Sequence, residues 1–184
     1  VRKASLEALS CATSMAARAS WPVTAVLVGS NLAAQADALQ RYGADCVLIV
    51  DDASLAAYTP EGYAAAARAA VDKVRPDAVF MAATGIGRDL SGRLAARLGV
   101  GCLADTTSLS LEGGTLVARR PVYSGKAMAT VDGGTSRPVV VTLRPNVFPV
   151  AEHPVVGTVE TLPAPAATIR AVLKEIIAKA SGEL

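Results

Sequence analysis

The stretch that decides the fold runs from Arg93 to Phe148 and reads RLAARLGVGCLADTTSLSLEGGTLVARRPVYSGKAMATVDGGTSRPVVVTLRPNVF. It opens with helical spacing, and a glycine-rich turn then leads into short segments in which apolar and polar residues alternate. Thr106–Leu111 and Thr115–Arg119 flank the turn Glu112-Gly113-Gly114, which predicts a β-hairpin.

The same pattern recurs further along this stretch. Ala127–Val131 and Pro138–Leu143 lie on either side of Asp132-Gly133-Gly134, which predicts a second antiparallel pair. We therefore expect these strands to form an antiparallel segment at one edge of the main sheet.

Upstream, continuous apolar runs alternate with segments of helical spacing. The runs Val23–Val28, Cys46–Val50 and Ala78–Ala82 predict strands that are buried on both faces. Helices are expected over 3–19, 32–42, 60–74 (with Thr59 as its N-cap) and 89–98, and Thr84–Arg88 is expected to be a turn. This alternation predicts an α/β fold: a doubly wound, mainly parallel sheet with helices on both faces.

The end of the chain differs in composition. Pro149–Pro165 is rich in proline, and an apolar stripe over 169–177 then predicts a last helix at about residues 166–180. We interpret 1–165 as one α/β domain and 166–184 as a C-terminal helix followed by the start of a linker. Because the chain opens with a helix and without Met, we expect it to be a fragment that lacks an opening strand and a following domain.

Composition restricts the classes of function. The chain has 184 residues, of which 52% are hydrophobic, a net charge of +2, and only 4% aromatic residues. A chain of this kind buries a sizeable core, but it lacks the basic stripe that nucleic-acid binding requires. Its longest apolar runs are too short to cross a bilayer, and we see no targeting segment. Cys11, Cys46 and Cys102 are too far apart for a disulfide framework or zinc site and indicate a reducing compartment.

One glycine-rich loop is a weak candidate for phosphate binding. Gly85, Gly87 and Arg88 follow a strand and precede a helix, where backbone amides and the helix dipole converge. The dinucleotide fingerprint is incomplete, because the next glycine, Gly92, lies five residues after Gly87 rather than three. A tight strand-to-helix turn with a solvated arginine is the simpler interpretation.

A second cluster of polar residues lies in the predicted antiparallel segment. Arg119, Arg120, Tyr123 and Lys126 surround a glycine turn, and Arg144 follows the last strand. Cations beside such a turn are suited to holding an anion, and equally to contacting carboxylates of a partner protein. We interpret these five residues as an interface, with the anion site as the alternative.

The sequence shows no catalytic or metal-binding constellation. Asp89, Asp105 and Asp132 are isolated acids, and a glycosidase-type pair needs two carboxylates at a set separation. His153, the single histidine, lies beside Pro154 in an expected loop, and no G-x-S-x-G motif is present. We therefore predict that this chain has no catalytic site of its own.

Several phrases resemble the N-terminal domain of the electron transfer flavoprotein alpha subunit. They are SLEAL at 5–9, LAARLG at 94–99, Asp105, RRPVYSGKA at 119–127 and RPNVF at 144–148. The resemblance implies an adenine-nucleotide-hydrolase-like fold and an alpha–beta heterodimer, cytoplasmic in bacteria or in the mitochondrial matrix in eukaryotes. It also implies that FAD is bound by the domain after this one, whose Ser-Gly-Gly-Arg-Gly phrase is absent here, and that AMP is held by the beta subunit in many members.

The function that the resemblance implies is a scaffold and interface domain of an electron carrier, not an enzyme. Such a carrier takes electrons from dehydrogenases, for example acyl-CoA dehydrogenases, and passes them to a quinone reductase or a similar acceptor. Two alternatives are a free-standing adenine-nucleotide-binding sensor and an enzyme with a phosphate-bearing substrate at Gly85–Arg88. The predicted antiparallel segment favours the docking domain, since neither alternative requires it.

Overall fold

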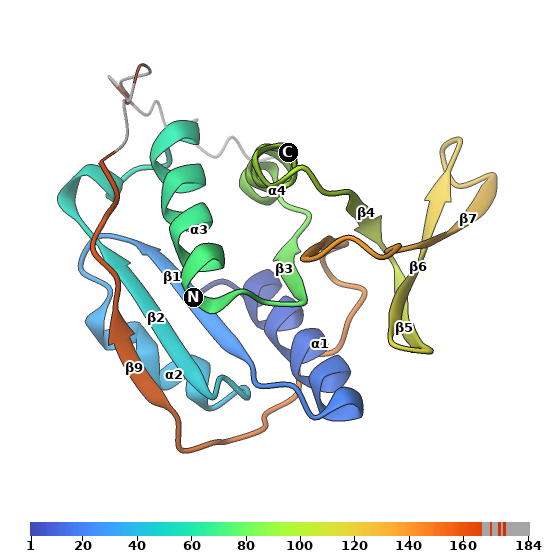
Figure 1. The fold of residues 1–184 in the computed structure, drawn as a ribbon, viewed down its shortest axis with the longest axis horizontal. Coiled ribbons are helices and arrows are strands. Elements are labelled where there is room, and N and C mark those ends of the chain that lie inside the picture. Colours follow the sequence, from blue (N-terminus) through green and yellow to red (C-terminus); the bar gives the residue numbers. More distant parts are fainter. Residues whose placement is uncertain (167–169, 171–172, 174, 176–184) are drawn as a thin grey trace, which may run out of the picture.

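The structure is a computed structural model that describes residues 1–166, 170, 173 and 175. Helices and strands alternate through its first half, and strands dominate its second (Figure 1). In chain order, the elements are α1 (Lys3–Ala19), β1 (Thr24–Gly29), η1 (Ala33–Gln35), α2 (Ala36–Gln40), β2 (Cys46–Asp51), η2 (Ala53–Leu55), α3 (Pro60–Val74), β3 (Ala78–Ala82), α4 (Gly85–Leu98), β4 (Cys102–Thr106), β5 (Ser108–Glu112), β6 (Thr115–Val122), β7 (Ala127–Asp132), β8 (Val139–Leu143) and β9 (Thr158–Thr161).

Within the described residues, the strands form three sheets of three strands each. Two are parallel, with the orders β1-β2-β9 and β3-β8-β4, and the third is antiparallel, with the order β5-β6-β7. The antiparallel sheet projects from the rest of the molecule as an arm (Figure 1). The α/β fold with parallel sheets, flanking helices and an antiparallel segment is therefore confirmed, although the parallel strands are divided between two sheets.

Strand β8 is the centre of the second parallel sheet. It pairs with β3 on one side and β4 on the other, and all five of its residues are buried. Its sequence, VVVTL, is apolar at almost every position, as expected for a strand covered on both faces. The chain therefore leaves the parallel sheet after β4, builds the antiparallel arm, and returns to fill the gap between β3 and β4.

Helix α1 packs against all three sheets. Ala8, Cys11 and Met15 belong to a core cluster that includes β3, β4, β8 and the arm strand β6. Leu9 and Ala16 belong to a second cluster with β1, β2 and α2. The two parallel sheets are not hydrogen-bonded to each other. The helix that buries one stripe of side chains against each of them therefore helps to fix the position of one sheet relative to the other.

The other face of the sheets is covered by α3 and α4. Val50 of β2 packs with Leu55 of η2 and with Ala66 of α3, while α4 contacts β8, β3 and β4. Residues alternate between the two faces along each strand, so Val47 and Ile49 of β2 face α1 and Val50 faces α3. Helices thus cover both faces, as the sequence predicts.

Several expectations for local structure are confirmed at their boundaries. Helix α1 covers the expected residues and ends at Ser20, which has a φ of 55°, directly before Trp21-Pro22. Helix α3 begins at Pro60 with Thr59 at the N-cap position, although the Thr59 side chain makes no capping hydrogen bond. The expected helix at 32–42 is shorter and is divided into η1 and α2.

The second predicted antiparallel pair is wrong. Strand β7 pairs with β6, whereas residues 139–143 form β8 in the parallel sheet. The turn at Asp132-Gly133-Gly134 therefore begins a crossover between sheets, and the Gly133 amide donates to the carbonyl of Leu116 over 2.8 Å. The continuous apolar pattern of VVVTL was the signal for a doubly buried strand rather than a hairpin strand.

Two strands escaped prediction because their sequences lack a strand pattern. In β4 the register shifts between Leu103 and Thr106, and this irregularity interrupts the alternation of side chains. In β9 every residue is exposed, so no apolar periodicity marks it. A Cβ on Gly157, just before β9, would lie 2.6 Å from the carbonyl oxygens of Ala44 and Asp45, so glycine allows the close approach of this segment to β2. The predicted C-terminal helix lies mainly outside the described residues.

Candidate functional site

The first candidate site, the glycine loop at Gly85–Arg88, is the first turn of α4 rather than a loop before it. The Thr84 hydroxyl accepts a hydrogen bond from the Gly87 amide over 3.2 Å, which caps the helix. One amide that a bound phosphate would use is therefore already satisfied within the chain.

Packing explains why position 87 is glycine. A Cβ at Gly87 would lie 1.9 Å from the carbonyl oxygen of Ala82, whereas a Cβ at Gly85 would meet nothing within 4 Å. Gly87 thus allows α4 to start close to the end of β3. The Arg88 side chain is 64% exposed, and its nearest acid is Asp105, with 3.9 Å between Nη2 and Oδ1. This geometry favours a tight strand-to-helix junction over a nucleotide site.

The second candidate site centres on Asp105, at the irregular end of β4. Asp105 has a φ of 56°, in the left-handed region that non-glycine residues seldom adopt. Its amide donates to the hydroxyl of Thr142, a residue of β8 that is 1% exposed, over 2.9 Å. The bulge therefore directs the Asp105 carboxylate toward the end of β8.

Arg144, the residue directly after β8, forms a two-pronged ion pair with Asp105. Its Nη2 lies 2.6 Å from Oδ2, and its Nε lies 3.1 Å from Oδ1. The hydrogen bond from Arg144 is the largest cause of a lowered Asp105 pKa, with smaller contributions from the charges of Arg144, Arg88 and Arg120. Asp105 is thus held ionised among three arginines, and this pairing was not predicted because 39 residues separate the partners.

The five predicted interface residues occupy the arm and its junction with the parallel sheet. Arg120, Tyr123 and Arg144 line one open depression of about 450 Å³. Arg119 is exposed and alternates with Arg120 along β6, so it lies on the opposite face of the antiparallel sheet. Lys126 is exposed beside the β6–β7 turn. The structure therefore brings three of the five residues together and places Arg119 elsewhere on the arm.

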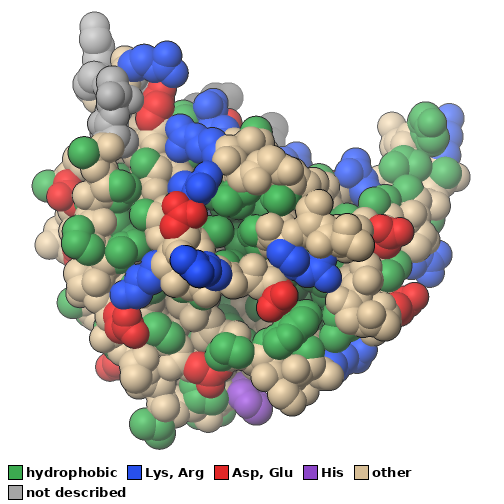
Figure 2. All heavy atoms as spheres, viewed as in Figure 1, with side chains coloured by type: hydrophobic (Ala, Val, Ile, Leu, Met, Phe, Trp, Pro, Cys, Tyr) green, Lys and Arg blue, Asp and Glu red, His purple; other side chains and the backbone are tan. Residues whose placement is uncertain are grey.

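The turn between β6 and β7 presents Tyr123 to solvent, with 81% of the residue exposed. Four residues, 123–126, connect the paired residues Val122 and Ala127, and Tyr123 and Ser124 both have positive φ values, 53° and 55°. Non-glycine residues seldom adopt this region, so Tyr-Ser is an unfavourable choice for backbone conformation alone. In the space-filling view a notch separates the arm from the helices, and acidic and basic side chains are mixed over this face (Figure 2).

The other acids that the sequence singles out have structural partners. Asp89 accepts hydrogen bonds from Tyr58 over 2.5 Å and from Arg93 over 2.8 Å, and these bonds tie the segment before α3 to α4. The hydrogen bond from Tyr58 is the largest cause of the lowered Asp89 pKa. Asp132 accepts from the Gly134 amide over 2.9 Å. None of these arrangements is a pair of carboxylates.

The cysteines behave as small apolar residues. Burial raises the pKa of Cys11 to about 11, and burial is also the largest cause of a raised pKa for Cys102. Both thiols therefore remain protonated near neutral pH and are poor nucleophiles. Within the described part of the chain, no group of acidic, cysteine or histidine side chains is arranged to hold a metal ion. No helix in the same part is long and apolar enough to cross a membrane.

Comparison with known proteins shows which family this chain belongs to. The family model described as the electron transfer flavoprotein domain matches residues 1–177. The chain belongs to this family. It is 37% identical over 159 residues to the electron transfer flavoprotein subunit alpha of Bacillus subtilis, which covers 85% of this chain and 49% of the relative. The chain spans about half the length of the curated alpha subunits that it matches.

Two further relatives indicate the range of proteins that carry this domain. The electron transfer flavoprotein subunit alpha of Clostridium acetobutylicum is 41% identical over 150 residues, which is 80% of this chain and 45% of the relative. The lactate dehydrogenase (NAD(+),ferredoxin) subunit LctC of Acetobacterium woodii is 35% identical over 154 residues, which is 83% of this chain and 37% of the relative.

Two of the phrases that suggested the resemblance to this family, at 5–9 and 144–148, meet in space. Glu7 of the SLEAL phrase is 2% exposed, and its Oε2 accepts from the amide of Asn146, in the RPNVF phrase, over 2.9 Å. Lys3 donates to the Asn146 Oδ1 over 3.2 Å and lies 3.4 Å from Glu7 Oε1. Helix α1 thus anchors the segment that follows β8 and carries Arg144. This contact was not predicted, although both phrases were recognised.

Two substitutions in α4 test the role assigned to Gly87. We expect Gly87→Ala to destabilise the chain by about 1–3 kcal/mol, because the added Cβ clashes with the backbone of Ala82. Gly92→Ala is the matched control in the same helix: its Cβ meets nothing within 4 Å, so we expect stabilisation of about 0.5–1 kcal/mol. Urea unfolding measures both. Equal effects of the two substitutions would show that Gly87 is not required for packing.

The Asp105–Arg144 pair predicts a specific dependence of stability on pH. Because the folded pKa of Asp105 lies below its ordinary value of 3.8, the pair stabilises the fold above that pH and the stabilisation is lost as pH falls through the folded pKa. Asp105→Asn should therefore lower the free energy of unfolding at about pH 7 and have a smaller effect near about pH 2.

A double-mutant cycle with Arg144→Gln provides the control for this prediction. The coupling between the two positions should be favourable near neutral pH and should disappear in acid. A coupling that is absent near neutral pH, or that is unchanged in acid, would contradict the assignment of the pair.

Proposed function

We propose that this chain is the scaffold and docking domain of the alpha subunit of a heterodimeric electron transfer flavoprotein. The observation that carries the proposal is the antiparallel arm, which exposes Tyr123 at its tip and belongs to a chain of this family. The arm has three strands, and one of its faces contributes to the core. A projecting arm of this kind is suited to contacting another protein rather than to catalysis.

The beta subunit is the proposed partner of the arm. Relatives named as alpha subunits imply a beta subunit, and tyrosine and arginine are enriched among the residues that dominate binding energy at interfaces. Tyr123, Arg120, Arg119 and Lys126 lie on the arm, and Arg144 lies at its base. Strand β7 is an edge of its sheet and also offers the exposed side chains of Met128 and Val131. An edge of this kind is usually covered by another element or another chain.

The redox chemistry is proposed to lie outside this chain. FAD would be bound by a domain other than residues 1–165, and AMP by the beta subunit; the chain matches about half the length of its relatives. Electrons would come from dehydrogenases such as acyl-CoA dehydrogenases and pass to a quinone reductase or a similar acceptor, in the bacterial cytoplasm or the mitochondrial matrix. In this arrangement, residues 1–165 supply a rigid surface, and the helix expected at 166–180 leads to the flavin domain.

A free-standing nucleotide sensor has less support. The amide of Gly87 is used by the Thr84 cap, and the glycine itself is required by the approach of α4 to β3. Neither feature calls for a bound nucleotide.

Assembly of the alpha and beta subunits tests the proposal. In the full-length subunit that contains this chain, we expect Tyr123→Ala and Arg120→Glu each to weaken binding of the beta subunit by about tenfold or more. Arg41→Glu is the matched control, because Arg41 is an exposed arginine next to α2, in the part of the molecule away from the arm (Figure 1). Titration calorimetry or light scattering measures the affinity. Parental affinity in both arm variants would show that these residues do not contact the beta subunit.

A further inference from the structure

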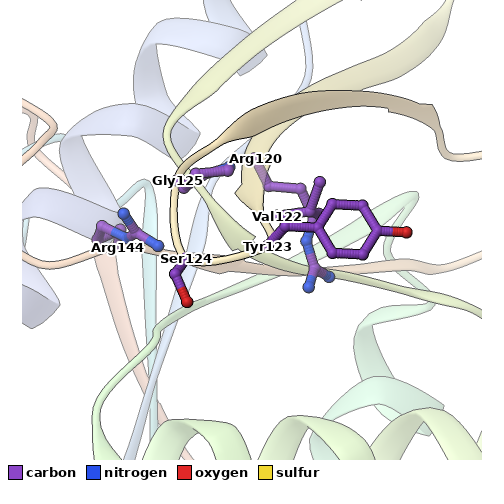
Figure 3. Close-up of a pocket in the computed structure, with 7 residues that line it drawn as sticks. Arg120, Val122, Tyr123, Ser124, Gly125 and Arg144 are labelled. Atoms are coloured by element: carbon purple, nitrogen blue, oxygen red, sulfur yellow. The ribbon is translucent and has the colours of Figure 1, made fainter.

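We propose that the depression between the β6–β7 turn and the end of β8 binds an oxyanion, a carboxylate or a phosphate group, through Arg120 and Arg144. The depression has a volume of about 450 Å³ and is lined by Arg120, Pro121, Val122, Tyr123, Ser124, Gly125 and Arg144. Arg120 and Arg144 approach the turn from different elements, β6 and the residue after β8 (Figure 3). The proposal concerns the lining of this depression and does not depend on the identity of the docking partner.

Positive charge exceeds negative charge around this depression. Arg144, Arg88 and Arg120 all act on the single carboxylate of Asp105. Asp105 occupies Nε and Nη2 of Arg144, and Arg88 lies 3.9 Å from the same carboxylate. Among the described residues, no carboxylate forms an ion pair with Arg120. One acid therefore faces three permanent cations, which leaves a net attraction for an anion.

Arg120 also has an unsatisfied donor. Its Nε is buried from solvent, and no described residue accepts a hydrogen bond from it. A buried N–H group without an acceptor is costly, so it calls for an explanation. Because Nε has no accessible surface, a ligand in the open depression would meet the terminal nitrogens of Arg120, and the planar guanidinium is suited to binding two oxygens of an oxyanion.

The turn supplies the remaining wall of the site. Tyr123, Ser124 and Gly125 have φ values of 53°, 55° and 86°, so three successive residues place their peptide groups in left-handed turn conformations. The amides of Gly125 and Lys126 already donate to the carbonyls of Val122 and Tyr123, each over 3.1 Å, so the Ser124 amide and hydroxyl are the donors that this turn offers to an anion. The residues that line the depression include hydrogen-bond donors and no Asp or Glu. This lining favours an anion over a cation or an apolar ligand.

Two sources of the oxyanion share this chemistry: a small free anion, and an Asp or Glu side chain of the beta subunit. Inorganic phosphate is the probe for both. We expect phosphate to stabilise the chain against unfolding, relative to chloride at equal ionic strength, and to shift the amide resonances of Ser124 and Gly125 with one saturable binding curve. We expect Arg120→Gln to weaken this binding by about tenfold.

Arg119→Gln is the matched control. It removes the same charge from the neighbouring residue of β6, on the opposite face of the sheet, and should change phosphate affinity by less than about twofold. The resonance shifts locate the anion even if Arg120→Gln reduces stability. Absence of a saturable shift at Ser124 and Gly125, or equal loss of phosphate binding in the two variants, would overturn the proposal.

The complex with the beta subunit distinguishes the two sources. If a partner carboxylate occupies the depression, phosphate should compete with assembly at constant ionic strength, and Arg120→Gln should abolish the competition. If the natural ligand is a free anion, phosphate should bind to the assembled complex as it does to the chain alone. Only this competition experiment rests on the proposed function. If the subunits fail to assemble, the measurement of phosphate binding to the chain alone still tests the proposal.

Discussion

The fold depends on the burial of β8 between β3 and β4. Its five residues are all buried, and the strand pairs with a neighbour along each edge. Burial of its apolar side chains therefore contributes much of the stability of the second parallel sheet. The chain reaches it only after building the antiparallel arm, and the arm is thus held at both ends by one sheet. Because Arg144 follows β8 directly, completion of the sheet also places Arg144 beside Asp105. The core and the candidate site are therefore fixed by the same strand.

The polar residues near this junction divide into two groups. Glu7, Thr142 and Asp105 make buried or partly buried hydrogen bonds that hold the ends of β4 and β8 in place. Tyr123 and Arg120 line the depression and have fewer partners among the described residues. In the proposed function, this packing presents a surface to a partner, and the redox group is bound elsewhere.

Much of the fold was predictable, because burial leaves a periodic pattern. Helix α1, helix α3 and the strands β1 to β3 follow from apolar spacing, and the β5–β6 hairpin follows from its glycine turn. The pairing of β8 was missed because the glycine turn at 132–134 resembles a hairpin turn, although the continuous apolar run of β8 is the pattern of a doubly buried strand. The exposed strand β9 has no such pattern. At the site, the arginines and Asp105 were recognised individually, but the pair of Asp105 with Arg144 and the bond from Asn146 to Glu7 join distant segments.

Amide hydrogen exchange, with and without the beta subunit, tests most directly the claim that β8 holds a pre-formed arm ready for docking. The amides of β8 should be the slowest to exchange in the chain alone, because they open only on global unfolding, and should remain slow in the complex. The amides of β7 and of the β6–β7 turn should exchange faster in the chain alone and become protected on binding. Protection that instead falls on β9 and α3, with the arm unchanged, or exchange of β8 before the arm, would contradict this account.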